Sequence, residues 1–306
     1  MRLVSAVVGV GLLLAGCSKE EPPERLALAE ALEQMAPMTV IVTKQALPDV
    51  LNNWHGVGLM AVKDTGERTL TVSEKVLKEG DAKGRRLLMY AAEDGNLALA
   101  VELRRLGVDV NERGRRQTTA LQTAVAAKQP LFVEWLLKEG AEVDAADEEG
   151  WTPLCYAVQA NNAWLVERLA RAGANVNPRL SDTLTPLMFA AWHGKLSALE
   201  ALLKVGAEVD AVDQTGATAL IHAAAEGRLK SCEALLKAGA NPNVATTKER
   251  YTALFLVAEV KIEPLCKLLL RFGADPDLKG YEGKSVREYA TEKGWKDVLE
   301  WLSAKR

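Results

Sequence analysis

One short motif returns at a nearly fixed interval along most of this chain. It is a helix-capping residue followed by two small or apolar residues. Its copies begin at Arg86, Thr119, Thr152, Thr185, Thr218, Thr252 and Ser285, a spacing of 33 residues with one step of 34. A unit this short cannot bury its own apolar face and must stack on its neighbours. The sequence therefore predicts a repeat array of seven units over residues 84–302.

Each unit is predicted to contain two short helices and a returning turn. Two leucine columns, at offsets of 2 and 17 residues from the start of the motif, give each helix a buried position. A glycine column marks the end of the second helix: Gly107, Gly140, Gly173, Gly206, Gly239 and Gly273. Glycine there fits a left-handed C-cap, and the motif threonine fits the N-cap of the next helix, with proline following it in Thr152-Pro153 and Thr185-Pro186.

The segments Gly150-Trp151-Thr152-Pro153-Leu154 and Gly173-Ala174-Asn175-Val176-Asn177 resemble the ankyrin repeat. The resemblance implies an all-α repeat solenoid of about six to seven helix-turn-helix units. Units are expected near 84–116, 117–149, 150–182, 183–215, 216–249 and 250–282, with a C-terminal cap at 283–306, where Arg287 replaces the motif leucine.

The sequence departs from the family at one position of the motif. The usual histidine is replaced in every copy, by Met89, Gln122, Cys155, Met188, Ile221 and Phe255. The hydrogen bond that this histidine supplies at the start of the helix must therefore be missing or replaced.

The N-terminus has the layout of a secretory signal peptide over residues 1–16. Arg2 precedes an apolar run that is too short to span a membrane, and Leu14-Ala15-Gly16-Cys17 follows. These residues resemble a bacterial lipoprotein processing site, which implies lipidation at Cys17 and anchoring to a membrane. The alternative is an ordinary signal peptide with a chance cysteine. Ser18 after the cysteine implies sorting to the outer membrane, facing the periplasm.

Two segments are expected between the anchor and the repeats. Residues 17–36 are charged and proline-bearing at first and then rich in Ala, Leu and Glu, which predicts a lipidated tether and a short helix. Residues 37–83 contain β-rich stretches flanking Asp64-Thr65-Gly66-Glu67. They predict a small β-containing N-terminal segment and a capping helix before the first repeat.

The sequence gives little reason to expect an enzyme. Its histidines are His55, His193 and His222, and no catalytic or metal-binding motif surrounds them. His222 is expected to pack within its repeat, and Cys155, Cys232 and Cys266 are expected to be buried thiols. We expect no cofactor, no metal and no small-molecule substrate. A net charge of -3 argues against nucleic acid as a partner.

The ankyrin resemblance implies that proteins bind a concave face of turn tips and first-helix flanks. The large or charged residues expected on that face are Trp151, Leu184, Trp192, His193, Glu226, Tyr251 and Glu259. The alternative for each aromatic residue is packing against its neighbouring turn.

Two functions fit these observations. The first is a lipid-anchored periplasmic module that captures one partner protein, in its sharpest form an immunity protein that inhibits an envelope-targeting toxin such as a lipase effector. The second is a structural envelope scaffold or stress-protection lipoprotein with several weak partners. Tight one-to-one capture favours the first, and weak or multiple binding favours the second.

Overall fold

The computed structural model describes residues 86–105, 107–180 and 183–303. This part of the chain is all-helical, with fourteen α-helices, two short 3-10 turns and no strand. The predicted all-α repeat solenoid is therefore confirmed. The signal peptide, Cys17, the tether and the β-containing segment of 37–83 lie outside the described residues.

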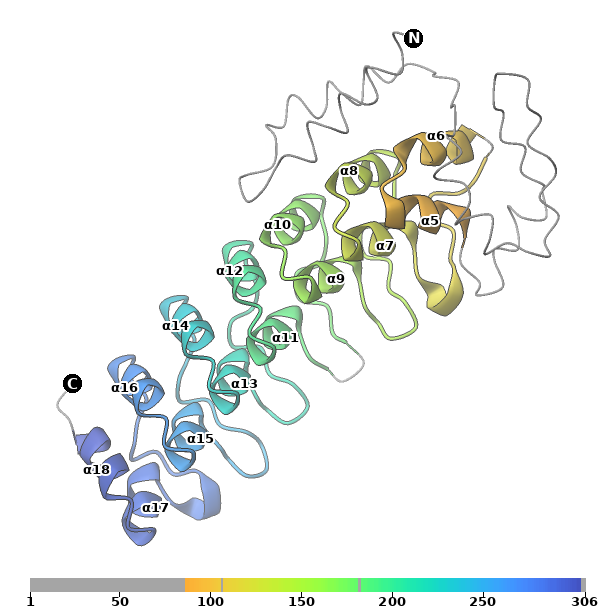
Figure 1. Ribbon diagram of the computed structural model, residues 1–306. Coiled ribbons are helices and arrows are strands. Elements are labelled where there is room, and N and C mark those ends of the chain that lie inside the picture. The colour runs from red at the N-terminus through yellow and green to blue at the C-terminus, as the bar shows by residue number, and fades with distance from the viewer. Residues whose placement is uncertain (1–85, 106, 181–182, 304–306) are drawn as a thin grey trace, which may run out of the picture. The chain divides into compact units, whose positions relative to one another are not determined.

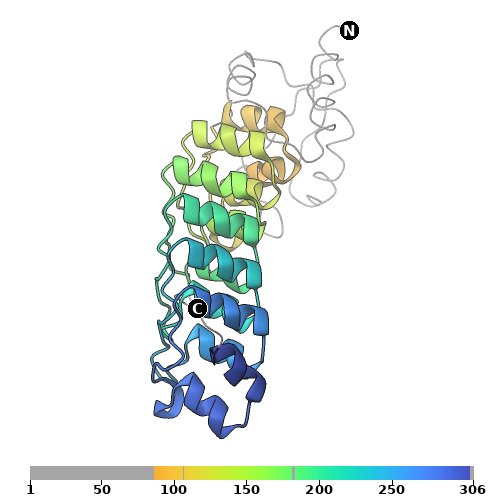
Figure 2. The same ribbon diagram turned by 90° about the vertical axis from the view of Figure 1, so that its left-hand side faces the viewer.

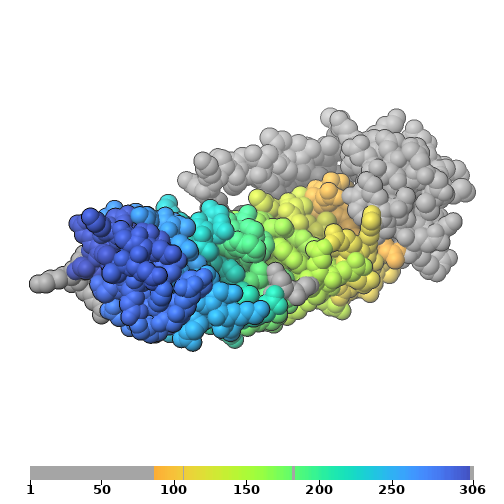
Figure 3. Space-filling model, turned by 90° about the horizontal axis from the view of Figure 1, so that it is seen from below, coloured from red at the N-terminus to blue at the C-terminus, as the bar shows by residue number. Residues whose placement is uncertain are grey.

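The helices alternate between two layers (Figure 1). The first helices of the units are α5 (Leu87–Asp94), α7 (Ala120–Ala126), α9 (Pro153–Gln159), α11 (Pro186–Trp192), α13 (Ala219–Ala225), α15 (Ala253–Glu259) and α17 (Val286–Glu292). The second helices are α6 (Leu97–Arg105), α8 (Pro130–Lys138), α10 (Ala163–Arg171), α12 (Leu196–Lys204), α14 (Leu229–Lys237), α16 (Glu263–Arg271) and α18 (Lys296–Ser303). Turns η1 (Arg115–Gln117) and η2 (Tyr281–Gly283) precede α7 and α17. Seen from below the view of Figure 1, the units follow one another in chain order (Figure 3).

The two leucine columns form the core between the layers. The first column is Leu88, Leu121, Leu154, Leu187, Leu220 and Leu254, and each of these side chains is at most 1% exposed. The second column is Leu103, Leu136, Leu169, Leu202, Leu235 and Leu269, and each is fully buried. Burying one leucine contributes roughly 1.5–3 kcal/mol, so these columns supply much of the energy that holds each unit to its neighbours.

Hydroxyl side chains cap most of the first helices, as the motif predicts. The capping oxygens of Thr119, Thr185, Thr218, Thr252 and Ser285 accept hydrogen bonds from the backbone N–H three residues on, over 3.2–3.3 Å. Thr152 makes no such cap, and its hydroxyl lies 3.3 Å from the sulfur of Cys155. The predicted glycines end the second helices with φ between 86° and 95°, the left-handed region in which glycine has no steric cost.

Asparagine and aspartate side chains tie each turn to the next one. Asn111 accepts from the backbone N–H of Glu142 over 2.8 Å, and Asn177 accepts from that of Glu208 over 3.0 Å. Asp144, Asp210 and Asn243 accept the equivalent bond in their own units, each from a backbone N–H of the following unit. The spacing of the repeats is thus fixed by a hydrogen bond between neighbouring turns as well as by the core.

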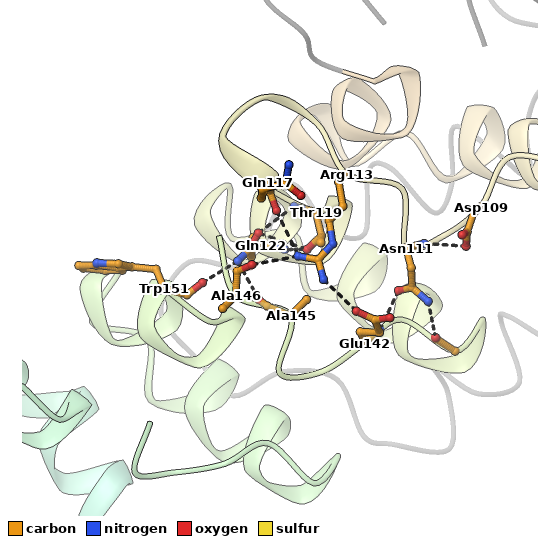
Figure 4. Close-up of polar contacts among 11 residues, drawn as sticks. Asp109, Asn111, Arg113, Gln117, Thr119, Gln122, Glu142, Ala145, Ala146 and Trp151 are labelled. Carbon is orange, nitrogen blue, oxygen red and sulfur yellow. Dashed lines mark hydrogen bonds and ion pairs between the residues drawn. The ribbon is translucent and has the colours of Figure 1, made fainter. Parts of the chain in front are cut away.

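Gln122 replaces the missing motif histidine in the second unit. Its Oε1 accepts from the backbone N–H of Thr119 over 2.8 Å, and its Nε2 donates to the carbonyls of Ala145 and Trp151 over 2.9 and 2.7 Å (Figure 4). One buried amide therefore closes the capping box of α7 and holds the turn that leads into α9. In the fourth unit, the sulfur of Met188 accepts the equivalent bond from Thr185 over 3.4 Å.

Candidate protein-binding face

The turns project to one side of the stacked helices (Figure 2). They lie next to the first helices, whose C-terminal ends carry exposed side chains such as Trp192, Glu226 and Glu259. We call this side of the described repeats the first-helix face. It is the surface on which the sequence places its candidate binding residues.

Six aromatic rings form a continuous line across the third, fourth and fifth units, which we call the aromatic ridge. In the order in which the rings contact one another, its members are Tyr156, Trp151, Phe189, His193, Trp192 and His222. Successive ring centroids lie 4.3–5.9 Å apart, so each ring packs directly against the next one. The ridge joins α9, α11 and α13, so its rings are held by three separate repeats.

Two turn aspartates anchor the ends of the ridge. The carboxylate of Asp147 accepts from the backbone N–H of Trp151 over 2.9 Å and from the hydroxyl of Tyr156 over 2.7 Å. Asp213, two units later, lies 2.8 Å from Nε2 of His222. Each aspartate binds its own turn backbone and a first-helix side chain nine residues on, which fixes the direction of that ring.

The hydrogen bonds made by the two aspartates shift the pKa values of Asp213 and Tyr156. Burial opposes the ionisation of Asp213, but hydrogen bonds from Thr215 and His222 outweigh it and hold the pKa of this carboxyl below its usual value. Burial, together with the hydrogen bond to Asp147, raises the pKa of Tyr156. Tyr156 therefore stays a neutral hydrogen-bond donor to Asp147.

The middle of the ridge is its most accessible part. Trp192 is 40% exposed, and its Nε1 donates to Oε1 of Glu226 over 3.3 Å. His193 is exposed beside it, with the two rings stacked 5.1 Å apart. A large indole held on both sides by imidazoles gives a rigid apolar contact surface, which is the kind of residue that dominates binding energy at protein interfaces.

The structure brings together some of the residues expected on the face and separates others. Trp151, Trp192, His193 and Glu226 join in or beside the ridge. Leu184 is only 6% exposed, so it supports the turn and offers little contact area.

Tyr251 belongs to a second aromatic group near the C-terminal end. Its ring stacks on that of Tyr281 at 5.0 Å and lies 5.3 Å from that of Phe255. Glu259 is exposed at the end of α15, next to Val260, which is 60% exposed.

Sequence reasoning missed Tyr156 and Phe189 as members of the ridge. Their signal was present in the sequence, because both occupy the first-helix position that His222 occupies in the fifth unit.

A hollow of about 400 Å³ opens on the first-helix face above α7. We call it the α7 hollow. Thr123, Ala126 and Ala127 are among the residues that line it, and Glu93 of α5 and Tyr156 of α9 form opposite walls. It lies directly beside the aromatic ridge, because Tyr156 belongs to both.

The cysteines of the repeats are buried free thiols, as expected. Burial raises the pKa of Cys155, and it raises those of Cys232 and Cys266 to about 12, so none of these thiols is a ready nucleophile.

Within residues 86–105, 107–180 and 183–303, no cluster of three or more His, Cys, Asp or Glu side chains could hold a metal ion. None of the helices described there is long and apolar enough to cross a membrane.

Comparisons with known proteins agree with this geometry. A family model described as ankyrin repeats, in three copies, matches residues 88–180 and 174–246, which together cover slightly more than half of the 306 residues. A match of 61 residues at 43% identity to the potassium channel AKT1 of Arabidopsis thaliana covers 20% of this chain and only 7% of the channel.

Solved structures extend the similarity over most of the array. The ankyrin repeat domain of Bcl-3, a member of the IkappaB protein family, is 28% identical with a TM-score of 0.66, covering 74% of this chain and 99% of that one. The human ASB11 ankyrin repeat domain is 27% identical with a TM-score of 0.60, covering 71% and 96%. An ankyrin repeat domain from Acinetobacter baumannii AYE is 30% identical with a TM-score of 0.55, covering 60% and 95%.

Proposed function

This chain belongs to the ankyrin-repeat family, and we propose that it is a lipid-anchored protein-binding module of a bacterial cell envelope. Ankyrin repeats indicate a protein–protein interaction module and are typically not enzymes. The observation that carries the proposal is the aromatic ridge. Its central indole, Trp192, is 40% exposed although the neighbouring rings hold it in place. An isolated array would gain from covering such a surface, and a partner protein would cover it.

Anchoring is supported by the residues Leu14-Ala15-Gly16-Cys17, which resemble a lipoprotein processing site. Several acyl chains on Cys17 would hold the protein on the outer membrane, because one chain alone binds only marginally. The repeats would then face the periplasm. Feeding cells an alkyne-bearing palmitate should label the wild-type protein and leave Cys17→Ser unlabelled. Labelling of Cys17→Ser at the wild-type level contradicts the anchor.

The most concrete form of this function is toxin immunity. A partner whose active site is covered by the first-helix face would be inhibited, and an envelope-targeting lipase effector is the partner that a periplasmic, membrane-tethered binder would meet. An envelope scaffold is the alternative role. A single tight one-to-one complex supports immunity, whereas several weak complexes support the scaffold.

Binding is tested with the full-length protein as bait and the double variant Trp151→Ala/Trp192→Ala. The double variant should weaken partner binding by about 30-fold or more, because truncating an interface hot spot costs about 2 kcal/mol or more. Leu229→Ala is the matched control. The exposed fraction of Leu229, 42%, is similar to the 40% of Trp192, but Leu229 lies on α14 in the other helix layer. Equal binding by wild type and the double variant rules out the ridge as the binding surface.

A further inference from the structure

We propose that the α7 hollow receives an arginine or lysine side chain of the bound partner. This inference rests on the proposed function, because it assigns one contact within the same binding face. It adds the chemical identity of a side chain that the face selects.

The hollow exists because α7 carries Thr123 and Ala126 where α5 and α9, on either side of it, carry larger side chains. Thr123 of α7 occupies the position of Tyr156 in α9. Ala126 and Ala127 occupy the positions of Trp192 and His193 in α11. The result is a floor of methyl groups with a tall aromatic wall on one side and the end of α5 on the other. Such a floor suits the aliphatic stem of a long side chain.

The walls favour a positive charge at the end of that stem. The charged side chain among the residues that line the hollow is a carboxylate, that of Glu93, and Asp94 is exposed beside it. On the other wall, Tyr156 donates its hydroxyl hydrogen to the carboxylate of Asp147 over 2.7 Å. A phenol that donates to an anion keeps an electron-rich ring, and such a ring attracts a cation placed over its face.

The cation that acts on Tyr156 does not reverse this preference. Arg116 approaches Tyr156 from η1, but its guanidinium is paired with the carboxylate of Glu149. An apolar side chain in the hollow would displace water from the carboxylate of Glu93 without replacing the hydrogen bonds of that water, and this carries a desolvation cost. An acidic guest would meet the carboxylates directly. A side chain with an apolar stem and a cationic head satisfies both the floor and the walls.

The test uses full-length protein carrying ¹³C-labelled alanine methyl groups, titrated with N-acetyl-arginine amide and, separately, with N-acetyl-norleucine amide. Norleucine supplies a similar stem without the charge. We expect the arginine probe to shift the methyl signals of Ala126 and Ala127 in a saturable way and to bind about fivefold more tightly than the norleucine probe. Equal affinity for the two probes, or no saturable shift with arginine, overturns the proposal.

Two leucine substitutions separate filling of the hollow from a general effect. Ala126 is exposed at the end of α7, and Ala225 is exposed at the same position of α13. Ala126→Leu should abolish the shift of the Ala127 methyl signal, and Ala225→Leu should leave it unchanged. An undiminished shift in Ala126→Leu also overturns the proposal. Because the probe titration needs no partner, it can fail while Trp192 still supports partner binding, so the two proposals are judged separately.

Discussion

Replacing Gln122 by methionine tests whether one buried amide does the work of the missing motif histidine. Gln122 is 1% exposed, and its side chain makes four hydrogen bonds: it accepts from the backbone N–H and the hydroxyl of Thr119, the N-cap of α7, and donates to two carbonyls of the following turn. Methionine has a similar volume and stands at the same motif position in the fourth unit, as Met188. The substitution therefore removes the two hydrogen bonds to the carbonyls of the following turn. It leaves a sulfur acceptor for the N-cap N–H, as Met188 provides for Thr185, and leaves the packing nearly unchanged.

The expected cost of Gln122→Met is about 2–3 kcal/mol. Each neutral hydrogen bond contributes about 1 kcal/mol net, and a buried group left without a partner costs a further 1–3 kcal/mol. The carbonyl of Trp151 keeps a second donor, the backbone N–H of Asp147 over 3.1 Å, which limits the loss there. The carbonyl of Ala145 bears most of the cost, because the methionine sulfur can still accept the backbone N–H of Thr119 as Met188 accepts that of Thr185.

Urea unfolding of the full-length protein, followed by far-UV circular dichroism, measures this cost. Amide hydrogen exchange locates it, because repeat arrays can open one unit at a time. Exchange should rise in the turn from Ala145 to Trp151, which loses the two hydrogen bonds from Gln122. Gln122→His is the matched variant, since it restores the family residue and should retain most of the stability. The reasoning is refuted if Gln122→Met unfolds within about 0.5 kcal/mol of wild type, the range of ordinary surface substitutions.

Three further predictions concern single residues elsewhere in the array. Burial raises the pKa of Glu112 to about 7 from 4.5, so the folded state holds a proton that the unfolded state has lost. Stability should therefore fall by about 3 kcal/mol as pH rises from 4.5 to above 7, and Glu112→Gln should flatten that slope in urea titrations at several pH values. Gly206 has φ of 90° with open space around its missing Cβ, so Gly206→Ala should cost about 1 kcal/mol through backbone strain alone, seen as a lower Tm. Asn177→Ala removes the acceptor for the backbone N–H of Glu208; it should cost about 1 kcal/mol and speed exchange at that amide, and unchanged exchange there would count against the turn-to-turn bond.

The repeat period was sufficient to predict the fold, because the features that set it are local. Leucines at fixed offsets and a glycine with positive φ determine two helices and a turn without reference to distant residues, and each unit then meets only its neighbours. The sequence predicted that the hydrogen bond of the motif histidine is missing or replaced. In the second unit Gln122 replaces it, because a glutamine amide can both accept and donate.

The composition of the face was harder to predict, because it depends on contacts between units. Trp151 reaches the ring of Phe189 in the next repeat, a contact that no pattern within one repeat specifies. The burial of Leu184 is a similar case, because Leu184 and Trp151 stand at the same position of the repeat and yet differ in exposure. Equivalent positions across repeats place Tyr156, Phe189 and His222 in one column, but the column alone does not show that rings from neighbouring repeats meet.

The turn aspartates couple the stability of the array to the order of its face. The side chain of Asp213 is 6% exposed and accepts hydrogen bonds from the backbone of Thr215 and Ala217 over 2.7 and 3.0 Å, while it also contacts His222. Asp213→Ala should therefore destabilise the fifth unit by about 2 kcal/mol.

The same substitution should release the imidazole of His222 that stacks on Trp192 at 5.9 Å. The indole N–H signal of Trp192, assigned by its loss in Trp192→Phe, should then shift and broaden in ¹⁵N spectra. Asp147→Ala is the control two repeats earlier, because it frees Tyr156 at the far end of the ridge and should leave that signal nearly unchanged. If Asp213→Ala lowers stability without moving the Trp192 signal, the aspartate supports its turn alone, and the order of the central indole must come from His193 and Glu226.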